Sequence, residues 1–150
     1  MVDVANVMGA RADGWWRDRA GAALRLCREV TALAGRTRQA DAHDSARGWV
    51  LVLEGRARAA EEAAREAAAA TATAAVEPGD GGEPGDTDGP ALVRVVSAAG
   101  SGDDAIVDVV TEVVAGGKSC LVVTADRDLR RRCEERGATV AGPGWLLSLL

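Results

Sequence analysis

Three short apolar runs, separated by segments of helical character, place the strongest constraint on how this chain folds. They are GWVLVLEG (48–55), ALVRVVSA (91–98) and KSCLVVTAD (118–126). The first is a continuous apolar run between glycines, which is typical of a strand buried on both faces. Because strands and helices alternate along the chain, we expect a mainly parallel sheet with helices on both faces.

Two further segments complete a sheet of five strands. VDVANV (2–7) is predicted as a short first strand that ends at the turn of Gly9, and ATVAGP (138–143) as a brief last one. The predicted class is therefore α/β.

Helical spacing and composition predict four helices between these strands. From Trp16 to Ala34 apolar side chains recur every three or four residues, as on one face of a helix. A later segment of Ala, Glu and Arg forms helices readily but lacks large apolar side chains, so we expect it at the periphery. The four predicted helices cover 15–34, 56–75, 101–117 and 127–137.

The length of 150 residues is typical of one domain, spanning 1–150, with a core large enough to fold unaided. Inside it, the segment 76–90 combines Gly, Pro and acidic residues and is predicted to be a flexible loop. The net charge is −5, and the five acidic residues of that loop contribute all of it. Net charge therefore does not exclude nucleic acid as a partner.

The cysteines and the apolar runs limit the cell compartment. Three cysteines occur without a CxxC pair or metal-ligand spacing, so we expect buried reduced thiols rather than disulfides or zinc ligands. No apolar run approaches the ~18 residues of a membrane span, and the chain opens without a secretory leader. Together these features predict a cytoplasmic protein with no membrane contact.

Acidic residues follow the predicted strands at three places. Asp3 ends the first apolar stretch, Asp103 and Asp104 open the helix after the third strand, and Asp126 ends the fourth. In a parallel sheet all these positions fall at the carboxyl edge, where such folds bind ligands. Carboxylates that converge repel one another unless a cation intervenes, and Mg²⁺ suits oxygen ligands and a phosphate substrate. Metal-dependent hydrolysis of a phosphodiester is the function that this pattern favours.

Each of these acids also has a structural interpretation. An aspartate at the start of a helix commonly caps it or faces its dipole. Helical phase ranks Asp103 above Asp104 as a ligand, because Asp103 shares a face with the apolar Ile106 and Val110.

Several polar and aromatic residues lie near the same edge. Asn6 is a candidate to orient Asp3 or to contact a phosphate, or a turn residue, and Thr124 is a candidate to contact a phosphate or a metal-bound water. Glu54 ends the second strand and is a further candidate. Either Trp15 or Trp16 could stack on a base, with Trp16 expected in the core. The arginines predicted to contact phosphates are Arg17, Arg127, Arg130 and Arg131, with Arg11, Arg19 and Arg132 nearby.

The stretches VDVANVMG, RADGWWRDRAG, GSGDDAIV and VVTADRDLRRR resemble the NYN branch of the PIN-like nuclease superfamily, in its small YacP-type bacterial forms. Asp3 with Asn6, Asp103 with Asp104, and Asp126 in Thr124-Ala125-Asp126 match the motifs of that family. The likeness covers nearly the whole chain except about 56–90. It implies a three-layer α/β/α sandwich with strand order 3-2-1-4-5, and cleavage of RNA that depends on Mg²⁺ or Mn²⁺.

The resulting hypothesis is a PIN-like endoribonuclease. Asp3, Asp103 and Asp126 bind the metal, Asp104 assists, and ribosome-associated mRNA or a structured RNA is the substrate. A homodimer is left open. The alternatives are a non-catalytic RNA- or protein-binding module of the same fold and a metal-dependent nucleotide pyrophosphohydrolase.

Overall fold

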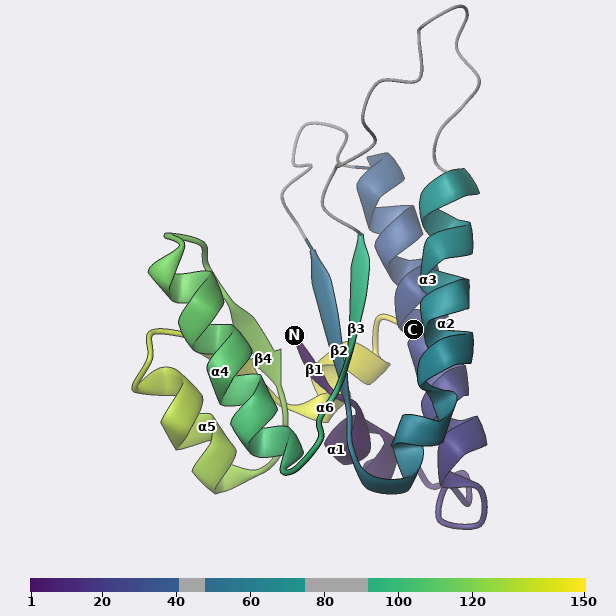
Figure 1. Cartoon of the computed structure of the whole chain (residues 1–150), viewed down its shortest axis with the longest axis horizontal. Coiled ribbons are helices and arrows are strands. Elements are labelled where there is room, and N and C mark those ends of the chain that lie inside the picture. Colours follow the sequence, from purple (N-terminus) through teal and green to yellow (C-terminus); the bar gives the residue numbers. More distant parts are fainter. Residues whose placement is uncertain (41–47, 75–91) are drawn as a thin grey trace, which may run out of the picture.

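A computed structural model describes residues 1–40, 48–74 and 92–150, and its centre is a five-stranded, all-parallel sheet in the order β3-β2-β1-β4-β5 (Figure 1). The sheet and its strand order confirm the predicted fold class. The predicted loop at 76–90 and the lone His43 lie outside the described residues. The strands are β1 (Val2–Asp3), β2 (Trp49–Leu53), β3 (Val93–Ser97), β4 (Leu121–Val123) and β5 (Thr139–Ala141).

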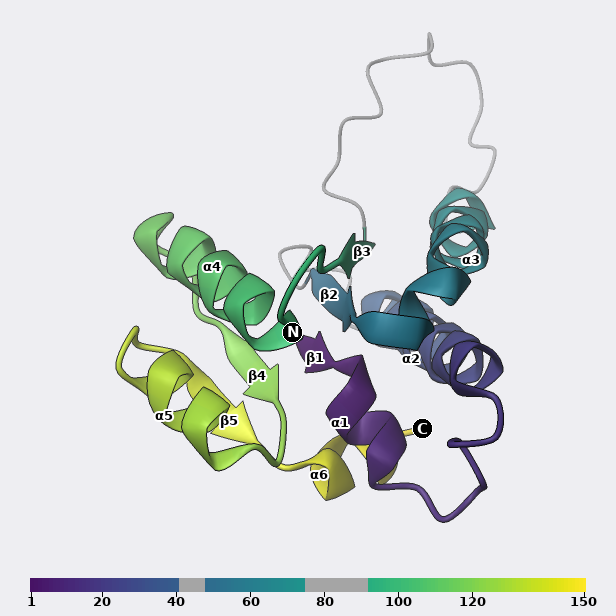
Figure 2. The same cartoon turned by 60° about the horizontal axis from the view of Figure 1, so that its bottom comes forward.

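Helices cover both faces of the sheet and make three layers, as the views in Figures 1 and 2 show. On one face lie α4 (Gly102–Ala115) and α5 (Arg127–Glu134). The other face carries the remaining helices, whose buried side chains join one apolar core. These are α1 (Val4–Gly9), α2 (Arg19–Ala40), the 3₁₀ helix η1 (Gly55–Ala60), α3 (Glu61–Ala74) and α6 (Pro143–Leu147).

The strands divide their side chains between two cores because successive residues of a strand point to opposite faces. In β2, Leu51 and Leu53 belong to the core beneath α2 and α3, whereas Val52 belongs to the core beneath α4 and α5. In β4, Val123 and Val122 divide in the same way. The continuous apolar run of β2 is thus explained by burial on both faces.

The predicted first strand at 2–7 is wrong, because the chain turns into α1 after only two strand residues. Val4, Val7 and Met8 are all buried, and their spacing is that of one helical face. Over so short a segment, an apolar run fits a strand and a helix equally well. The carboxylate of Asp3 decides between them, since it accepts a hydrogen bond from the Asn6 amide and so caps α1.

The first long helix begins later than predicted, at Arg19 rather than near residue 15. Asp18 accepts a hydrogen bond from the Gly21 amide at 2.8 Å, which satisfies one free donor of the new helix. The preceding loop places Trp15 against the core and leaves Trp16 58% exposed. The expectation that Trp16 is a core residue is therefore wrong, and Trp15 packs there instead.

The Ala-rich segment predicted at 56–75 is helical, as η1 followed by α3, and it packs through small side chains. Ala57, Ala60, Ala64 and Ala68 are buried in the same core as α2. Close approach of the two helices explains how they pack without large side chains. A methyl group on Gly35 of α2 would lie 3.1 Å from the Cγ2 atom of Thr71 in α3.

The remaining predictions hold with small changes of boundary. Ser101 caps α4, and Gly116 follows its last turn. The helix predicted to stop at Gly137 ends at Glu134, and Gly137 adopts φ +86° in the turn that follows. All three cysteines are free, with Cys27 and Cys133 buried, and burial raises the pKa of Cys27 to about 12. Within the described ranges, none of the helices is long and apolar enough to cross a membrane.

Candidate functional site

The carboxyl edge of the sheet directs three polar side chains toward the α4–α5 face. Asp3 pairs with Val52, whose side chain lies in the core of that face. By the two-residue period of a strand, Glu54 and Thr124 also point there, two residues beyond Val52 and Val122. The sheet therefore supplies the floor of a polar site, and α4 and α5 begin beside it.

Asp3 is held by two hydrogen bonds and is only 7% exposed. Its Oδ1 atom accepts from the Asn6 amide at 3.0 Å, and its Oδ2 atom accepts from the Thr124 hydroxyl at 2.9 Å. Asp3 thus has the local partner that the sequence did not reveal, namely the first turn of α1. Its position is fixed by α1 on one side and by the end of β4 on the other.

Asn6 and Thr124 both tie the β4–α5 connection to this carboxylate. The side-chain oxygen of Asn6 accepts from the Ala125 amide at 2.9 Å, and the Thr124 hydroxyl oxygen accepts from the Asp126 amide at 3.1 Å. Both residues were predicted to bind substrate, and the structure places them as supports of Asp3 and Asp126. Contact with a substrate stays a prediction.

Glu54 lies over the beginning of α4, where its Oε2 atom accepts from the Gly102 amide at 2.9 Å. The glycine at this position leaves room for that carboxylate. A Cβ atom added to Gly102 would lie 2.5 Å from the same Oε2 atom. Glu54, a further candidate from the sequence, therefore lies over the start of α4, and this close approach explains the glycine at position 102.

Asp103 and Asp104 open α4, as predicted, but their side chains differ. Asp104 is exposed and forms an ion pair with Arg132 of α5 at 2.5 Å. Asp103 is half-buried, and it has no hydrogen bond or ion pair with any other described residue. The ranking of Asp103 as a ligand, with Asp104 in support, stays a prediction.

Asp126 is exposed and caps α5, where its Oδ1 atom accepts from the Leu129 amide at 2.8 Å. Its structural interpretation from the sequence is therefore correct. The negative charge of Asp126 also acts on Asp103, whose pKa it raises.

The four carboxylates act on one another electrostatically. Burial raises the pKa of Asp3, and the negative charges of Asp103 and Glu54 raise it further against the opposing hydrogen bonds. Burial also raises the pKa of Asp103, followed by the charges of Asp126 and Glu54, with Arg132 acting in the opposite direction. Residues that are distant in sequence thus form one negatively charged group, which we call the carboxylate group: Asp3, Glu54, Asp103 and Asp126.

The chemistry of this group fits a hard divalent cation, although its atoms do not form a complete ligand set. Carboxylate oxygens are the ligands that Mg²⁺ and Mn²⁺ prefer, and Asp103 has a carboxylate without a described partner. Within residues 1–40, 48–74 and 92–150, however, no three acidic, cysteine or histidine side chains are gathered closely enough to hold one ion. Coordination by Asp3, Asp103 and Asp126 stays a prediction.

The arginines predicted to contact phosphates fall into two groups. Arg131 pairs with both Asp128 and Glu135, at 2.7 Å each, on the outer surface of α5. Arg17 and Arg127 are exposed and Arg130 is half-buried, and the structure shows no side-chain ion pair between them and the other described residues. The three unpaired arginines are therefore the better candidates for a phosphate.

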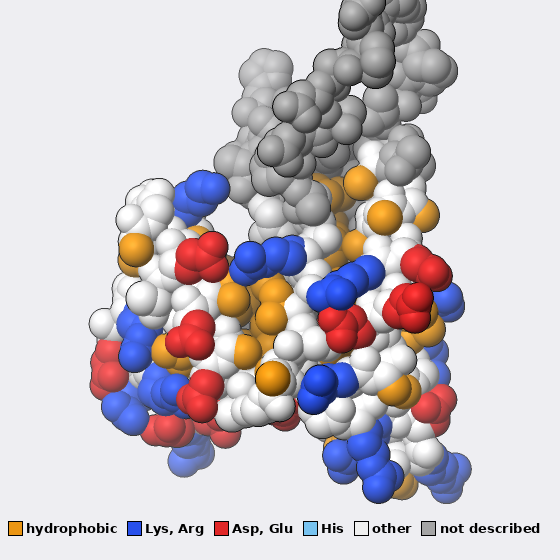
Figure 3. All heavy atoms as spheres, in the orientation of Figure 1, with side chains coloured by type: hydrophobic (Ala, Val, Ile, Leu, Met, Phe, Trp, Pro, Cys, Tyr) orange, Lys and Arg blue, Asp and Glu red, His pale blue; other side chains and the backbone are white. Residues whose placement is uncertain are grey.

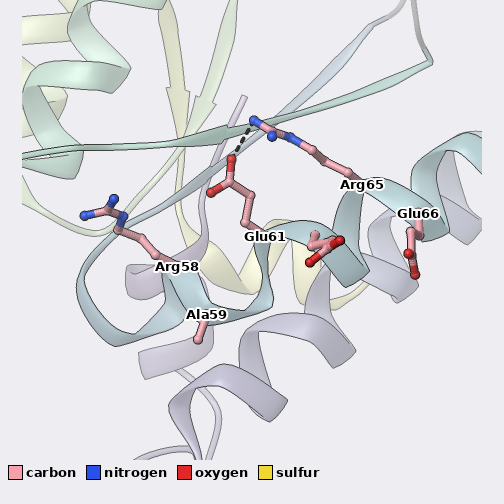
Figure 4. A pocket seen from close by; sticks show the side chains of 6 residues that line it. Arg58, Ala59, Glu61, Arg65 and Glu66 are labelled. Atoms are coloured by element: carbon pink, nitrogen blue, oxygen red, sulfur yellow. Dashed lines mark ion pairs between the residues drawn. The ribbon is translucent and has the colours of Figure 1, made fainter.

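Two arginines that the sequence interpretation missed follow Glu54 directly. Arg56 and Arg58 are exposed on η1, next to the carboxyl end of β2. In Figure 4, Arg58 extends away from the ion-paired Glu61 and Arg65. Their position immediately after a predicted strand could have identified them as candidates, as it did for the acids.

A shallow cavity of about 620 Å³ lies beside η1 and the start of α3 (Figure 4). None of the carboxylate group lines it, and its charges are of both signs, so it does not point to one class of ligand. Figure 3 likewise shows acidic and basic side chains mixed over the face of the molecule seen in Figure 1. The residues that line the cavity are Arg58, Ala59, Glu61, Glu62, Arg65 and Glu66.

Comparison of the chain with known protein families, with curated proteins and with solved structures found no match. The resemblance to the NYN branch therefore rests on the sequence motifs, and function must be argued from the site.

Proposed function

We propose that this protein is a metal-dependent ribonuclease whose site is the carboxylate group. The observation that carries the proposal is the convergence of acids from four separate segments at one edge of the sheet, with the pKa of Asp3 and of Asp103 raised. Keeping several carboxylates together is unfavourable unless a cation or a proton offsets their repulsion. Asp103 lies in the first turn of α4, where the helix dipole favours an acid, but its carboxylate makes no hydrogen bond or ion pair with the described residues.

The residues of the site have different roles in the proposed reaction. Asp103, whose pKa is raised by the charge of Asp126, would hold the cation together with Asp126, with Asp3 and Glu54 beside them. When bound, a divalent cation supplies an activated water and neutralises charge on the phosphodiester. Thr124 and Asn6 keep Asp3 and the β4–α5 connection in place. Arg127 and Arg130, at the start of α5, are available to hold the phosphate.

Three variants test the metal requirement. Asp103→Asn removes a charge from a side chain without described partners, and Asp126→Asn keeps the cap on α5 because Asn caps helices as well as Asp does. Asp108→Asn is the matched control, an exposed acid on the same helix. We expect Mn²⁺ to raise the melting temperature of the wild type and the control by several degrees, and of the two site variants much less.

Cleavage is measured with end-labelled single-stranded RNA in Mg²⁺ or Mn²⁺, with DNA and nucleoside triphosphates in parallel. We expect RNA to be cut by the wild type and by Asp108→Asn, and at least 100-fold more slowly by Asp103→Asn and Asp126→Asn. Intact RNA in the wild-type reaction, or equal rates for all variants, would contradict the nuclease. Consumption of triphosphates with RNA intact would indicate the pyrophosphohydrolase instead.

A second candidate is a binding module of the same fold that does not cut RNA. It is favoured by the lack of a complete ligand set among the described residues and by the structural use of Asp3 and Asp126 as helix caps. RNA binding that is unaffected by Mn²⁺ and by Asp103→Asn, without cleavage, would select this candidate.

A further inference from the structure

The loop between α1 and α2 exposes an aromatic ring in a fixed orientation. Trp16 is 58% exposed, more than any other large apolar side chain in the described part of the chain. Its ring meets that of Trp15 edge-on, with centroids 6.2 Å apart and planes at 86°. Because Trp15 packs against the core, this contact holds Trp16 to the body of the protein.

The backbone of the loop is also tied down. The Trp15 amide donates to the Asp13 carboxylate at 3.1 Å, and the Arg17 amide donates to the Gly14 carbonyl at 3.0 Å. Gly14 adopts φ +78°, which permits the tight turn. An exposed indole on so constrained a loop loses little freedom when a flat partner covers it.

Two cationic side chains beside this ring are available to an anionic partner. Arg17 and Arg19 are exposed and have no ion pair among the described residues, and the Arg19 guanidinium lies 5.2 Å from the centre of the Trp15 ring. The carboxylates of Asp13 and Asp18 are already engaged by backbone amides, the second at the start of α2. The positive end of that helix offsets the charge of Asp18.

The loop is also close to the carboxylate group along the chain. It follows α1, which begins beside Asp3 and has only six residues, about 9 Å of helix. Figure 1 shows this loop at the same end of the molecule as the connections that leave the carboxyl ends of β2 and β3. The loop and the carboxyl ends of these strands therefore lie at one end of the molecule.

We propose that Trp16, Arg17 and Arg19 form a docking site for single-stranded RNA, in which an unpaired base stacks on the indole and the arginines contact adjoining phosphates. Stacking requires a base that is not in a duplex, and aromatic platforms beside cations are how proteins hold single strands. The inference rests on the proposed function for the identity of the polymer, and it names the substrate class as unpaired rather than double-stranded RNA.

The test is equilibrium binding of a fluorescein-labelled ten-nucleotide RNA, followed by anisotropy in EDTA so that neither a metal ion nor cleavage contributes. Trp16→Ala is expected to weaken binding about 5- to 150-fold. Trp16→Phe should recover part of that loss. Trp145→Ala, which removes a 43% exposed indole from α6, is the matched control and is expected to bind as the wild type does.

Charge and strand state give two further measurements. Arg17→Gln should reduce the slope of log Kd against log salt concentration, by the amount that one phosphate contact contributes. The same RNA annealed to its complement should bind more weakly than the single strand, and Trp16→Ala should not change the affinity for the duplex.

Equal binding by Trp16→Ala and the wild type, an equal loss in Trp145→Ala, or no affinity of the wild type for RNA would each overturn the proposal. So would self-association of the wild type that Trp16→Ala abolishes, measured by sedimentation, because the ring would then face protein. Failure of the proposed nuclease appears instead in the cleavage assay with Asp103→Asn.

Discussion

The apolar cores on the two faces of the sheet differ in size. Beneath α2, η1 and α3 lies a core of twenty-one buried described residues, many of them alanine and valine, whereas beneath α4 and α5 the core has eight. The smaller core carries the carboxylate group at its edge and is joined across its helices by the exposed Arg132–Asp104 ion pair. The large core therefore supplies most of the buried apolar residues, whereas the acids that repel one another lie at the edge of the smaller core.

Removing one leucine from each core gives the largest expected effects. Leu26→Ala in α2 and Leu129→Ala in α5 each empty a fully buried site and should cost about 2–5 kcal/mol. We expect Leu26→Ala to lower the free energy of global unfolding, measured with urea. Leu129→Ala should lower hydrogen-exchange protection chiefly in α5, whose cap belongs to the site. If Leu129→Ala reduces protection of α2 by as much as that of α5, the two layers are not distinct.

Thr31 marks a defect in the large core. Its hydroxyl is buried without a hydrogen-bond partner among the described residues, on the face of α2 that packs inward. Thr31→Val keeps the shape and removes the unpaired group, so stability in urea should rise by about 1 kcal/mol. Thr37→Val is the control, because that hydroxyl donates to the carbonyls of Leu33 and Ala34 and its loss should give no gain. A loss of stability in Thr31→Val would show that the hydroxyl is satisfied in solution.

The packing of Glu54 against Gly102 is tested by a double-mutant cycle. Gly102→Ala forces the carboxylate away and breaks its bond to the amide, which should lower stability. In a Glu54→Ala background only the Cβ atom of residue 54 remains near, 3.2 Å from the added methyl group, so the same change should lower stability much less. The expected coupling is about 1 kcal/mol, from urea unfolding of the four proteins. Additive effects would mean that Glu54 does not lie over α4 in solution.

The smallest effect concerns the charge of Asp103. A carboxyl group whose pKa is higher in the folded than in the unfolded state lowers stability above the folded pKa, and this penalty disappears as pH falls toward the unfolded value near 4. Asp103→Asn should therefore be more stable than the wild type at pH 7, by about 0.5 kcal/mol, the size of an exposed charge pair. The difference should shrink by pH 4.5. Urea unfolding of both proteins at the two pH values measures it, with Asp108→Asn as a control that should show no such trend.

The sheet was predictable because its strands lie in short, mainly apolar runs that are separated by helical segments. The acids at its edge were predictable for the same reason, since each follows a strand. The boundary at Asp3 was not, because an aspartate after two strand residues can end a strand or cap a helix, and only the contact with Asn6 decides.

Tertiary contacts also determine which of two identical neighbouring side chains is buried or ion-paired. Trp15 and Trp16 are adjacent, and only the path of the loop determines which one is buried. Arg130 and Arg131 are likewise neighbours, yet Arg131 alone lies within reach of Asp128 and Glu135. The glycine at position 102 leaves room for Glu54. That role cannot be inferred from the sequence alone, because it requires knowing that the two segments meet.

The capping bonds of Asp3 and Asp126 have an evolutionary consequence. Asparagine can accept the same amide hydrogen bonds, and one nucleotide change converts an aspartate codon into an asparagine codon. A lineage of this fold can therefore lose charge at either position in a single mutational step while the helix start remains capped. Among relatives of this chain, copies that have lost these carboxylates and still fold would be expected to carry Asn at these positions more often than Ala or Gly.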